Sequence, residues 1–218
     1  MRRPAFFRRR EIWLPTLWGC LLFLSVGACG LVLLARHIHD FLALNDPVGA
    51  RVLVVEGWMG PEELDEAAAV FRARGYQRLI TTGGPIHRWP PAPGPASYAE
   101  QAARYLLQQG LTDSVVTAVP ADEMSHDRTY SSAVTLRDWL NRSGMRWEAI
   151  DVISDGPHAR RSRLLYRLAF GPQVTIGILA TRSYDYDAAA WWRSSKGATN
   201  VIEQTVGFVW AKCCFRPD

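Results

Sequence analysis

Residues 51–75 read RVLVVEGWMGPEELDEAAAVFRARG, and this stretch decides the predicted fold. The apolar run over residues 52–55 is typical of a strand that is buried on both faces. A helix is expected over residues 61–74, because Pro61 stands at its first turn and four acidic side chains lie near its positive end. Gly75 ends that helix. A buried strand followed at once by a helix is the first half of a βαβ unit.

The same alternation continues to the end of the chain. Further strands are expected over residues 78–82, 114–119, 149–154 and 174–179, and further helices over residues 97–109, 128–142, 157–170 and 200–215. This spacing predicts an α/β fold over residues 51–218, a Rossmann-like three-layer sandwich with a mostly parallel sheet. Ligands of such sheets bind outside the carboxyl ends of the strands, so candidate site residues are sought there.

The amino-terminal region has the pattern of a membrane anchor. Residues 12–35 carry no charged side chain, and as a helix they would rise roughly 35 Å, enough to cross a hydrocarbon core of about 30 Å. We expect a transmembrane helix over residues 12–35, a basic cytoplasmic tail over 1–11 and a linker over 36–50. Five arginines precede the apolar run, whereas only Arg36 and Arg51 follow it closely. The positive-inside rule therefore places the α/β domain outside the cytoplasm.

Two alternatives to an uncleaved anchor are considered. The sequence Val26-Gly27-Ala28-Cys29 resembles a lipobox, which would make the chain a lipoprotein modified at Cys29. A cleaved signal peptide would need a short apolar core before a small-residue cleavage site. The apolar run continues through Leu34, past both cleavage positions, and this favours the anchor.

Charge and composition exclude several classes of function. The chain has 218 residues, which suits one domain plus an anchor, and residues 36–218 carry 20 basic and 20 acidic side chains. A neutral body argues against nucleic-acid binding, which needs a basic face. No Cys and His spacing is typical of a zinc site, and neither GxGxxG nor a Walker A pattern is present. We therefore expect no metal and no cofactor.

Three of the expected strand ends carry candidate ligand groups. Gly83 and Gly84 follow the second strand, where backbone N–H groups can approach a phosphate or a carboxylate; a tight turn is the alternative interpretation. Arg128 and Thr129 begin the helix after the third strand and would present a charge and a hydroxyl to the same cleft. Glu56 ends the first strand, as a carboxylate base or as an acid paired with an Arg.

The segment Ser154-Asp155-Gly156-Pro157-His158-Ala159-Arg160-Arg161 is the richest in chemistry. It joins a strand to a helix, and a helix N-terminus favours anions. His158 and Arg161 are three residues apart and share a helix face. The Arg161 guanidinium could bind a phosphate with two donors. His158 could transfer a proton near neutral pH, with Asp155 or Glu56 as a second proton-transfer group. A helix cap followed by a solvated basic face is the alternative.

Two further clusters have mixed interpretations. Asp127 is expected to cap the helix that follows it, and His126 to lie in a surface loop. Trp191 and Trp192 would lie on a membrane surface, cover the cleft or pack against the last helix.

Taken in order, five segments resemble one known family. They are RVLVVEGW (51–58), LITTGGP (79–85), SYAEQAARYLLQQGL (97–111), DRTYSSA (127–133) and SDGPHARRSRLLYRLAFG (154–171). Their succession resembles the ElyC/SanA/YdcF family of bacterial envelope proteins. The resemblance implies a Rossmann-like domain, and maps the family's Gly-Gly turn to Gly83 and Gly84, its helix-start Thr to Thr129, and its His-x-x-Arg to His158 and Arg161. One departure is that Ser131 and Ser132 follow Thr129, where family members often have a Thr-x-x-Asn pattern.

The resemblance also implies a functional class. Members are linked to peptidoglycan and lipid-carrier metabolism, which suggests an anchored protein of the bacterial inner membrane and a phosphate-bearing, lipid-linked substrate. The anion would be held by Arg128, Arg161 and the Gly83-Gly84 amides, in an enzyme of phosphoester or glycosyl-phosphate chemistry, a hydrolase or a transferase. The alternative is a non-catalytic envelope factor that binds an anionic ligand or a partner. Binding of S-adenosylmethionine, suggested for a cytoplasmic relative, or of a nucleotide would require the domain to face the cytoplasm.

Overall fold

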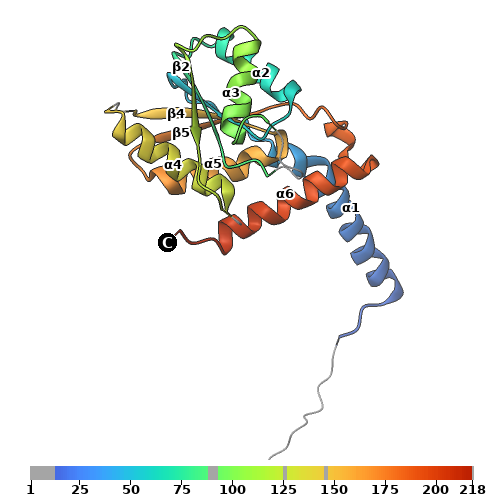
Figure 1. The fold of residues 1–218 in the computed structure, drawn as a ribbon. Coiled ribbons are helices and arrows are strands. Elements are labelled where there is room, and N and C mark those ends of the chain that lie inside the picture. Colours follow the sequence, from blue (N-terminus) through green and yellow to red (C-terminus); the bar gives the residue numbers. More distant parts are fainter. Residues whose placement is uncertain (1–12, 88–92, 125–126, 145–146, 218) are drawn as a thin grey trace, which may run out of the picture. The chain divides into compact units, whose positions relative to one another are not determined.

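The computed structural model describes residues 13–87, 93–124, 127–144 and 147–217. Within them, all strands belong to one five-stranded parallel sheet of order β3-β2-β1-β4-β5 (Figure 1). The strands are β1 (Val52–Glu56), β2 (Arg78–Gly83), β3 (Val116–Pro120), β4 (Ala149–Ser154) and β5 (Thr175–Ala180). The α/β fold and the parallel sheet expected from the sequence are confirmed.

Helices cover both faces of the sheet (Figure 1). The strand β1 shows why, because its side chains alternate between two cores. Leu53 and Val55 pack in a core with α2 (Pro61–Ala73) and α3 (Tyr98–Gln108). Val52 and Val54 pack in a second core with α4 (Arg128–Arg142) and α5 (Ala159–Phe170). All four side chains are buried, which explains the unbroken apolar run.

The strand order reverses in the middle of the sheet. The chain passes from β1 outward to β2 and β3, and then returns to place β4 on the other side of β1. The crevice at such a reversal, at the carboxyl ends of β1 and β4, is where open parallel sheets bind ligands. Glu56 ends β1 and Ser154 ends β4, so both lie at this point.

Local sequence signals explain most helix starts. Pro61 is at the first turn of α2, and a full capping box joins Ser97 to Glu100 at the start of α3. The helix α4 differs from expectation. Asp127 adopts a left-handed conformation with φ of 55°, and its side chain makes no capping hydrogen bond. Asp127 therefore stands at the N-cap position, but the expected cap by its side chain is wrong. His126, which was expected in a surface loop, lies outside the described residues.

The chain divides into two compact units, Met1–Arg36 and His37–Asp218. The helix α1 (Leu17–Leu42) begins in the first unit and ends in the second. It starts after Pro15, where the Thr16 hydroxyl accepts a hydrogen bond of 3.2 Å from the Gly19 N–H. By length and composition α1 is able to cross a membrane. The helix starts later than the expected residue 12, and the expected tail over residues 1–11 lies outside the described residues.

The expected linker over residues 36–50 is part of the folded body. The helix α1 continues to Leu42, because no helix breaker occurs before Asn45-Asp46-Pro47. The Leu42 side chain is fully buried. Asp46 then pairs with Ile178 of β5 as an antiparallel bridge. The Asp151 carboxylate accepts hydrogen bonds from the N–H groups of Val48 and Ala50.

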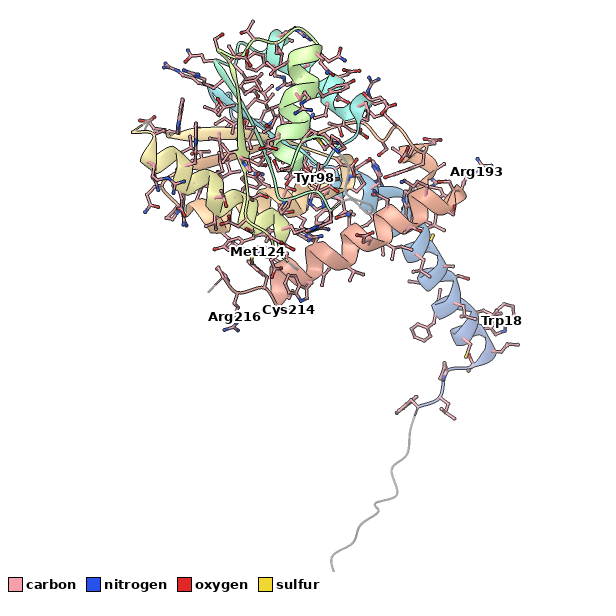
Figure 2. The ribbon with its side chains drawn as sticks, in the orientation of Figure 1. Trp18, Tyr98, Met124, Arg193, Cys214 and Arg216 are labelled. Carbon is pink, nitrogen blue, oxygen red and sulfur yellow. The ribbon has the colours of Figure 1, made fainter. Side chains whose placement is uncertain are left out.

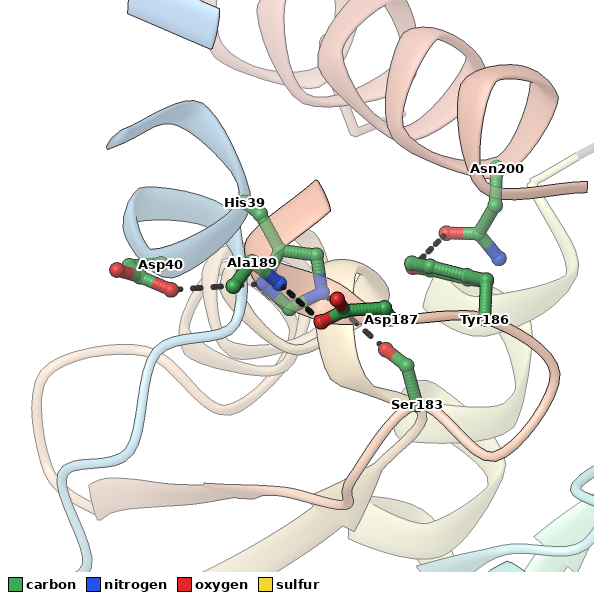
Figure 3. A network of polar contacts seen from close by, with 7 residues as sticks. All are labelled: His39, Asp40, Ser183, Tyr186, Asp187, Ala189 and Asn200. Carbon is green, nitrogen blue, oxygen red and sulfur yellow. Dashed lines mark hydrogen bonds and ion pairs between the residues drawn. The ribbon is translucent and has the colours of Figure 1, made fainter. Parts of the chain in front are cut away.

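Polar contacts also fix the end of α1 to the loop that follows β5 (Figure 3). The His39 Nε2 and Ser183 Oγ atoms are 3.2 Å apart, and the His39 ring meets the edge of Tyr186. Tyr186 in turn donates a hydrogen bond of 3.4 Å to Asn200 of the last helix.

That last helix, α6 (Ser195–Cys213), starts earlier than the expected residue 200. The Ser194 hydroxyl caps it by accepting a hydrogen bond from the Gly197 N–H. A short 3-10 segment, η2 (Ala188–Arg193), precedes it and carries Trp191 and Trp192. Trp192 is 43% exposed, so it is not buried against the last helix.

Candidate functional site

A cavity of about 570 Å³ lies at the carboxyl ends of β1 and β2. Its walls include seven residues that the sequence analysis singled out: Glu56, Gly83, Gly84, Arg128, Thr129, His158 and Arg161. Tyr98 and Met124, both labelled in Figure 2, also line it. The structure therefore brings together residues from β1, β2, α4 and α5 that lie far apart in the sequence.

Glu56 lies on the floor of the cavity in a buried hydroxyl network. Its carboxylate accepts hydrogen bonds from the hydroxyls of Ser154, at the end of β4, and Ser162, on α5. Burial raises the pKa of Glu56 to about 7, although the two serines and the nearby Arg161 charge oppose the shift. Glu56 thus has the proton affinity of a group that exchanges protons near neutral pH.

His158 is held between two side chains from different helices. Its Nδ1 atom lies 2.8 Å from Oε1 of Gln204 on α6, and its Nε2 atom lies 3.4 Å from Oγ1 of Thr129 on α4. The Gln204 oxygen only accepts, so Nδ1 carries the proton and Nε2 is left as an acceptor for the Thr129 hydroxyl. A hydroxyl, an imidazole and an orienting group in this order are the parts of a nucleophile–base pair.

The charge state of His158 follows from its surroundings. Burial, and then the charge of Arg161, lower its pKa to about 4, although the Gln204 hydrogen bond and Asp155 favour protonation. His158 is therefore neutral at pH 7. The Trp58 ring packs edge-on against the imidazole, with centroids 5.1 Å apart, and shields it from water.

Arg161 is the strongest candidate anion ligand. It lines the cavity, and its Nε atom is buried without a hydrogen-bond partner among the described residues. A Cβ atom at Gly207 of α6 would lie 2.7 Å from the Arg161 Nη1 atom, so the glycine leaves room for the guanidinium. A buried donor without a partner is costly, and a bound anion would supply the missing acceptor. Arg128 is exposed at the start of α4 and adds a second positive charge.

The two glycines have different structural roles. Gly83 has φ of +149°, and a Cβ atom there would lie 2.8 Å from the Tyr98 Cβ atom. This position therefore needs glycine for the close packing of β2 against the start of α3. At Gly84 the nearest atom to an added Cβ would be 3.6 Å away, so packing does not explain that residue.

Asp155 is not brought into the cavity. A hydrogen bond from Asn200 holds its carboxylate, and burial is the largest cause of its raised pKa. Its charge acts on His158 from outside the lining. The expectation that Asp155 moves a proton stays a prediction without a geometric basis.

The cavity also has an acidic rim. Asp122, Glu123, Asp127 and Glu203 contribute to the lining, so the positive charge is concentrated at Arg128 and Arg161 and not spread over the walls. Within the described ranges, no group of three or more His, Cys, Asp or Glu side chains is arranged to hold a metal ion.

Sequence reasoning did not single out Ser162, Gln204 or Gly207. Ser162 follows Arg161 directly, four residues after His158, so helical spacing could have placed it at the site. Gln204 and Gly207 come from the last helix, whose packing partner no motif in the sequence indicates. Trp58 was not named as a candidate either, although it lies two residues after Glu56 at the end of the first strand and within the quoted segment RVLVVEGW.

Comparison with known proteins gives no assignment, because no protein-family model matches the chain and no curated protein matches it significantly. The resemblance to the ElyC/SanA/YdcF family stays a prediction, and the function has to be argued from the site itself.

Proposed function

We propose that this chain is a membrane-anchored envelope protein of the ElyC/SanA/YdcF type whose cavity takes a phosphate-bearing, lipid-linked envelope precursor. One observation carries the proposal: the half-buried Arg161 side chain lines the cavity, and its buried Nε donor has no partner among the described residues. Arg128 and the Gly84 backbone lie on the same walls. A phosphate between them would meet two guanidinium groups, which bind it with paired donors.

The neighbouring groups support phosphoester or glycosyl-phosphate cleavage. The His158 Nε2 atom accepts the proton of the attacking hydroxyl, from Thr129 or from water, as the new bond to the substrate forms. The oxygen that leaves takes a proton from Glu56. Neutral His158 predominates above pH of about 4, and protonated Glu56 predominates below about 7. Activity is therefore expected to be highest between these values and to fall above pH 7 as Glu56 loses its proton.

The proposed location rests on charge asymmetry around the anchor. Five arginines precede α1 and few basic residues follow it closely, so the amino terminus would stay in the cytoplasm of a bacterial cell. The α/β domain would then face the outside of the inner membrane, where lipid-linked precursors of the envelope are present and nucleotides and S-adenosylmethionine are scarce.

A second candidate function is binding without catalysis. The observation that favours it is that Glu56 already accepts hydrogen bonds from both Ser154 and Ser162, as a structural buried acid does. In that case the cavity would hold an anionic envelope ligand, and His158 would only shape its wall.

A turnover assay separates the two functions. The full chain in detergent micelles is incubated with a polyprenyl diphosphate and with its sugar-linked form, and released phosphate and sugar phosphate are measured. For an enzyme, His158→Ala should abolish release and leave ligand binding in place. If neither substrate is cleaved at any pH between 4 and 8 and both are bound, the protein is a binding factor.

A further inference from the structure

The helix α6 carries an exposed apolar stripe. Ile202, Val206, Val209 and Trp210 are between 43% and 64% exposed. At 100° per residue, these positions fall within an arc of about 100° of the helix, roughly opposite the buried Gln204. Cys213 continues the same arc and is also exposed. An unpartnered apolar stripe of this width on a surface helix marks an interaction surface.

Cationic side chains flank α6 at both ends, and one of them, Lys196, is paired with Asp185 at 3.2 Å. Residues 188–217 contain four basic side chains and one acidic one, Glu203. Arg193 lies just before the helix, and Arg216 just after it (Figure 2). Trp192 and Trp210 are both 43% exposed. An apolar stripe with Trp, flanked by cations, is the composition of a helix that lies in the interface of an anionic bilayer.

The chain itself keeps α6 close to the end of the apolar helix. Phe41 packs edge-on against Phe208 of α6, with ring centroids 5.6 Å apart, and the Arg160 guanidinium stacks over Phe41 at 3.9 Å. The uncharged run ends just before Arg36. Phe41 comes five residues after Arg36, so about 7.5 Å of helix rise separates the two residues. This short tether holds α6 within reach of the bilayer surface if α1 spans the membrane.

We propose that the stripe of α6, formed by Ile202, Val206, Val209 and Trp210, lies in the surface of the same anionic bilayer that α1 enters. This inference rests on the membrane anchoring in the proposed function, but not on the chemistry of the cavity. Glu203 and Gln204 of the same helix line the cavity. A helix is only about 10 Å across. A lipid-linked phosphate would therefore reach Arg161 from the headgroup layer without its lipid tail leaving the membrane.

Fluorescence from single probes tests this placement. The four cysteines Cys20, Cys29, Cys213 and Cys214 are replaced by Ala in the full chain, and Val206→Cys is labelled with an environment-sensitive dye. The protein is placed in vesicles of phosphatidylethanolamine and phosphatidylglycerol that carry lipid-bound nitroxides. Because an interfacial helix buries its apolar face about 5–10 Å deep, quenching at 206 should exceed that of a Leu168→Cys control by about threefold. Leu168 is the matched control, because it is apolar, 40% exposed and on α5.

The outcomes distinguish this inference from the proposed function. A probe on Cys29, with the other three cysteines replaced, reports whether α1 is in lipid; no lipid quenching there would overturn both the anchor and the stripe placement. If Cys29 is quenched and the probe at 206 is quenched by aqueous iodide, only the stripe placement is wrong. If 206 is shielded from iodide and from lipid nitroxides, a protein such as a second copy covers the stripe, and the inference is again wrong.

A second variant tests the stripe without moving the probe. A dye on the native Cys213 should also be quenched by lipid. Combining Val206→Asp with Val209→Asp should remove that quenching, because two carboxylates oppose burial of the stripe in the bilayer. Both positions are more than half exposed, so we expect the variant to fold. Unchanged quenching of Cys213 in this variant would show that the apolar stripe does not hold the helix on the membrane.

Discussion

At the residue scale, Glu56 is an acid in a buried position, because only 3% of it is exposed. Burial raises its pKa from 4.5 to about 7, so the folded state binds the proton more tightly than the unfolded state does. The stability that this proton supplies is complete below pH of about 4.5 and is lost as the pH rises through 7. A shift of this size corresponds to a penalty on the order of 3 kcal/mol at pH 8.

Replacing the acid tests this linkage. Glu56→Gln keeps the shape and removes the titration, so its unfolding midpoint should change little between pH 5 and pH 8, whereas that of the wild type should fall. Thermal unfolding in detergent micelles at several pH values measures the difference. Parallel pH dependence in the two proteins would mean that Glu56 does not titrate in this range.

Gln204 is a positioning residue for His158 in the proposed reaction. Gln204→Leu removes the acceptor of the Nδ1 proton, so the imidazole loses its fixed tautomer, and turnover should fall about tenfold or more. Gln204→Glu is the control, because its carboxylate accepts the same hydrogen bond and also raises the pKa of His158. The acid limb of the pH–rate profile should then move upward. A Leu variant with the rate and the profile of the wild type would contradict this role.

At the scale of elements, the junction of β2 and α3 depends on one glycine of the pair. Gly83→Ala should destabilise the protein by about 1–3 kcal/mol, because φ of +149° is strained for alanine and its Cβ would meet Tyr98. Gly84→Ala is the matched control and should change stability by about 0.5 kcal/mol or less. Urea denaturation of the full chain measures both. Equal losses of stability in the two variants would contradict the prediction that close packing against Tyr98 makes glycine necessary at position 83.

The elements also show how far sequence reasoning reaches. The strands of the sheet were predictable, because apolar runs end at turn residues. The starts of α2 and α3 were predictable too, because Pro61 and the Ser97–Glu100 capping box mark them. The rule that parallel sheets bind ligands at strand ends pointed to Glu56, Gly83 and His158, which the structure places around one cavity. Their roles in ligand binding and catalysis stay predictions.

The contribution of the last helix was not predictable. Gln204 meets His158 across 46 residues, and only the packing of α6 against α5 brings them together. The start of α6 was placed too late, because Ser194-Ser195-Lys196-Gly197 has the composition of a loop, although Ser194 is its N-cap. The segment 36–50 looked like a linker, because its pairing with β5 involves backbone groups that have no sequence signature.

At the scale of the whole molecule, we predict that the α/β domain lies outside the cytoplasm. Alkaline phosphatase and green fluorescent protein are each fused after Asp218 and produced in bacterial cells. Phosphatase activity without fluorescence is expected, because the basic residues before α1 should hold the amino terminus inside. Fluorescence without phosphatase activity would contradict the exported domain, and soluble cytoplasmic ligands would then have to be tested in the cavity.

A binding measurement tests whether the cavity holds a lipid-linked phosphate through Arg161, as we propose. The full chain in micelles is titrated with a polyprenyl phosphate and with the matching neutral polyprenol. The wild type should bind the phosphate and not the alcohol, and Arg161→Gln should weaken binding about tenfold or more, since a charge-assisted pair contributes about 1.5–3 kcal/mol. Arg167→Gln, at an exposed position of α5 outside the cavity, should bind as the wild type does. Equal affinity of the wild type and Arg161→Gln for the phosphate would contradict the claim.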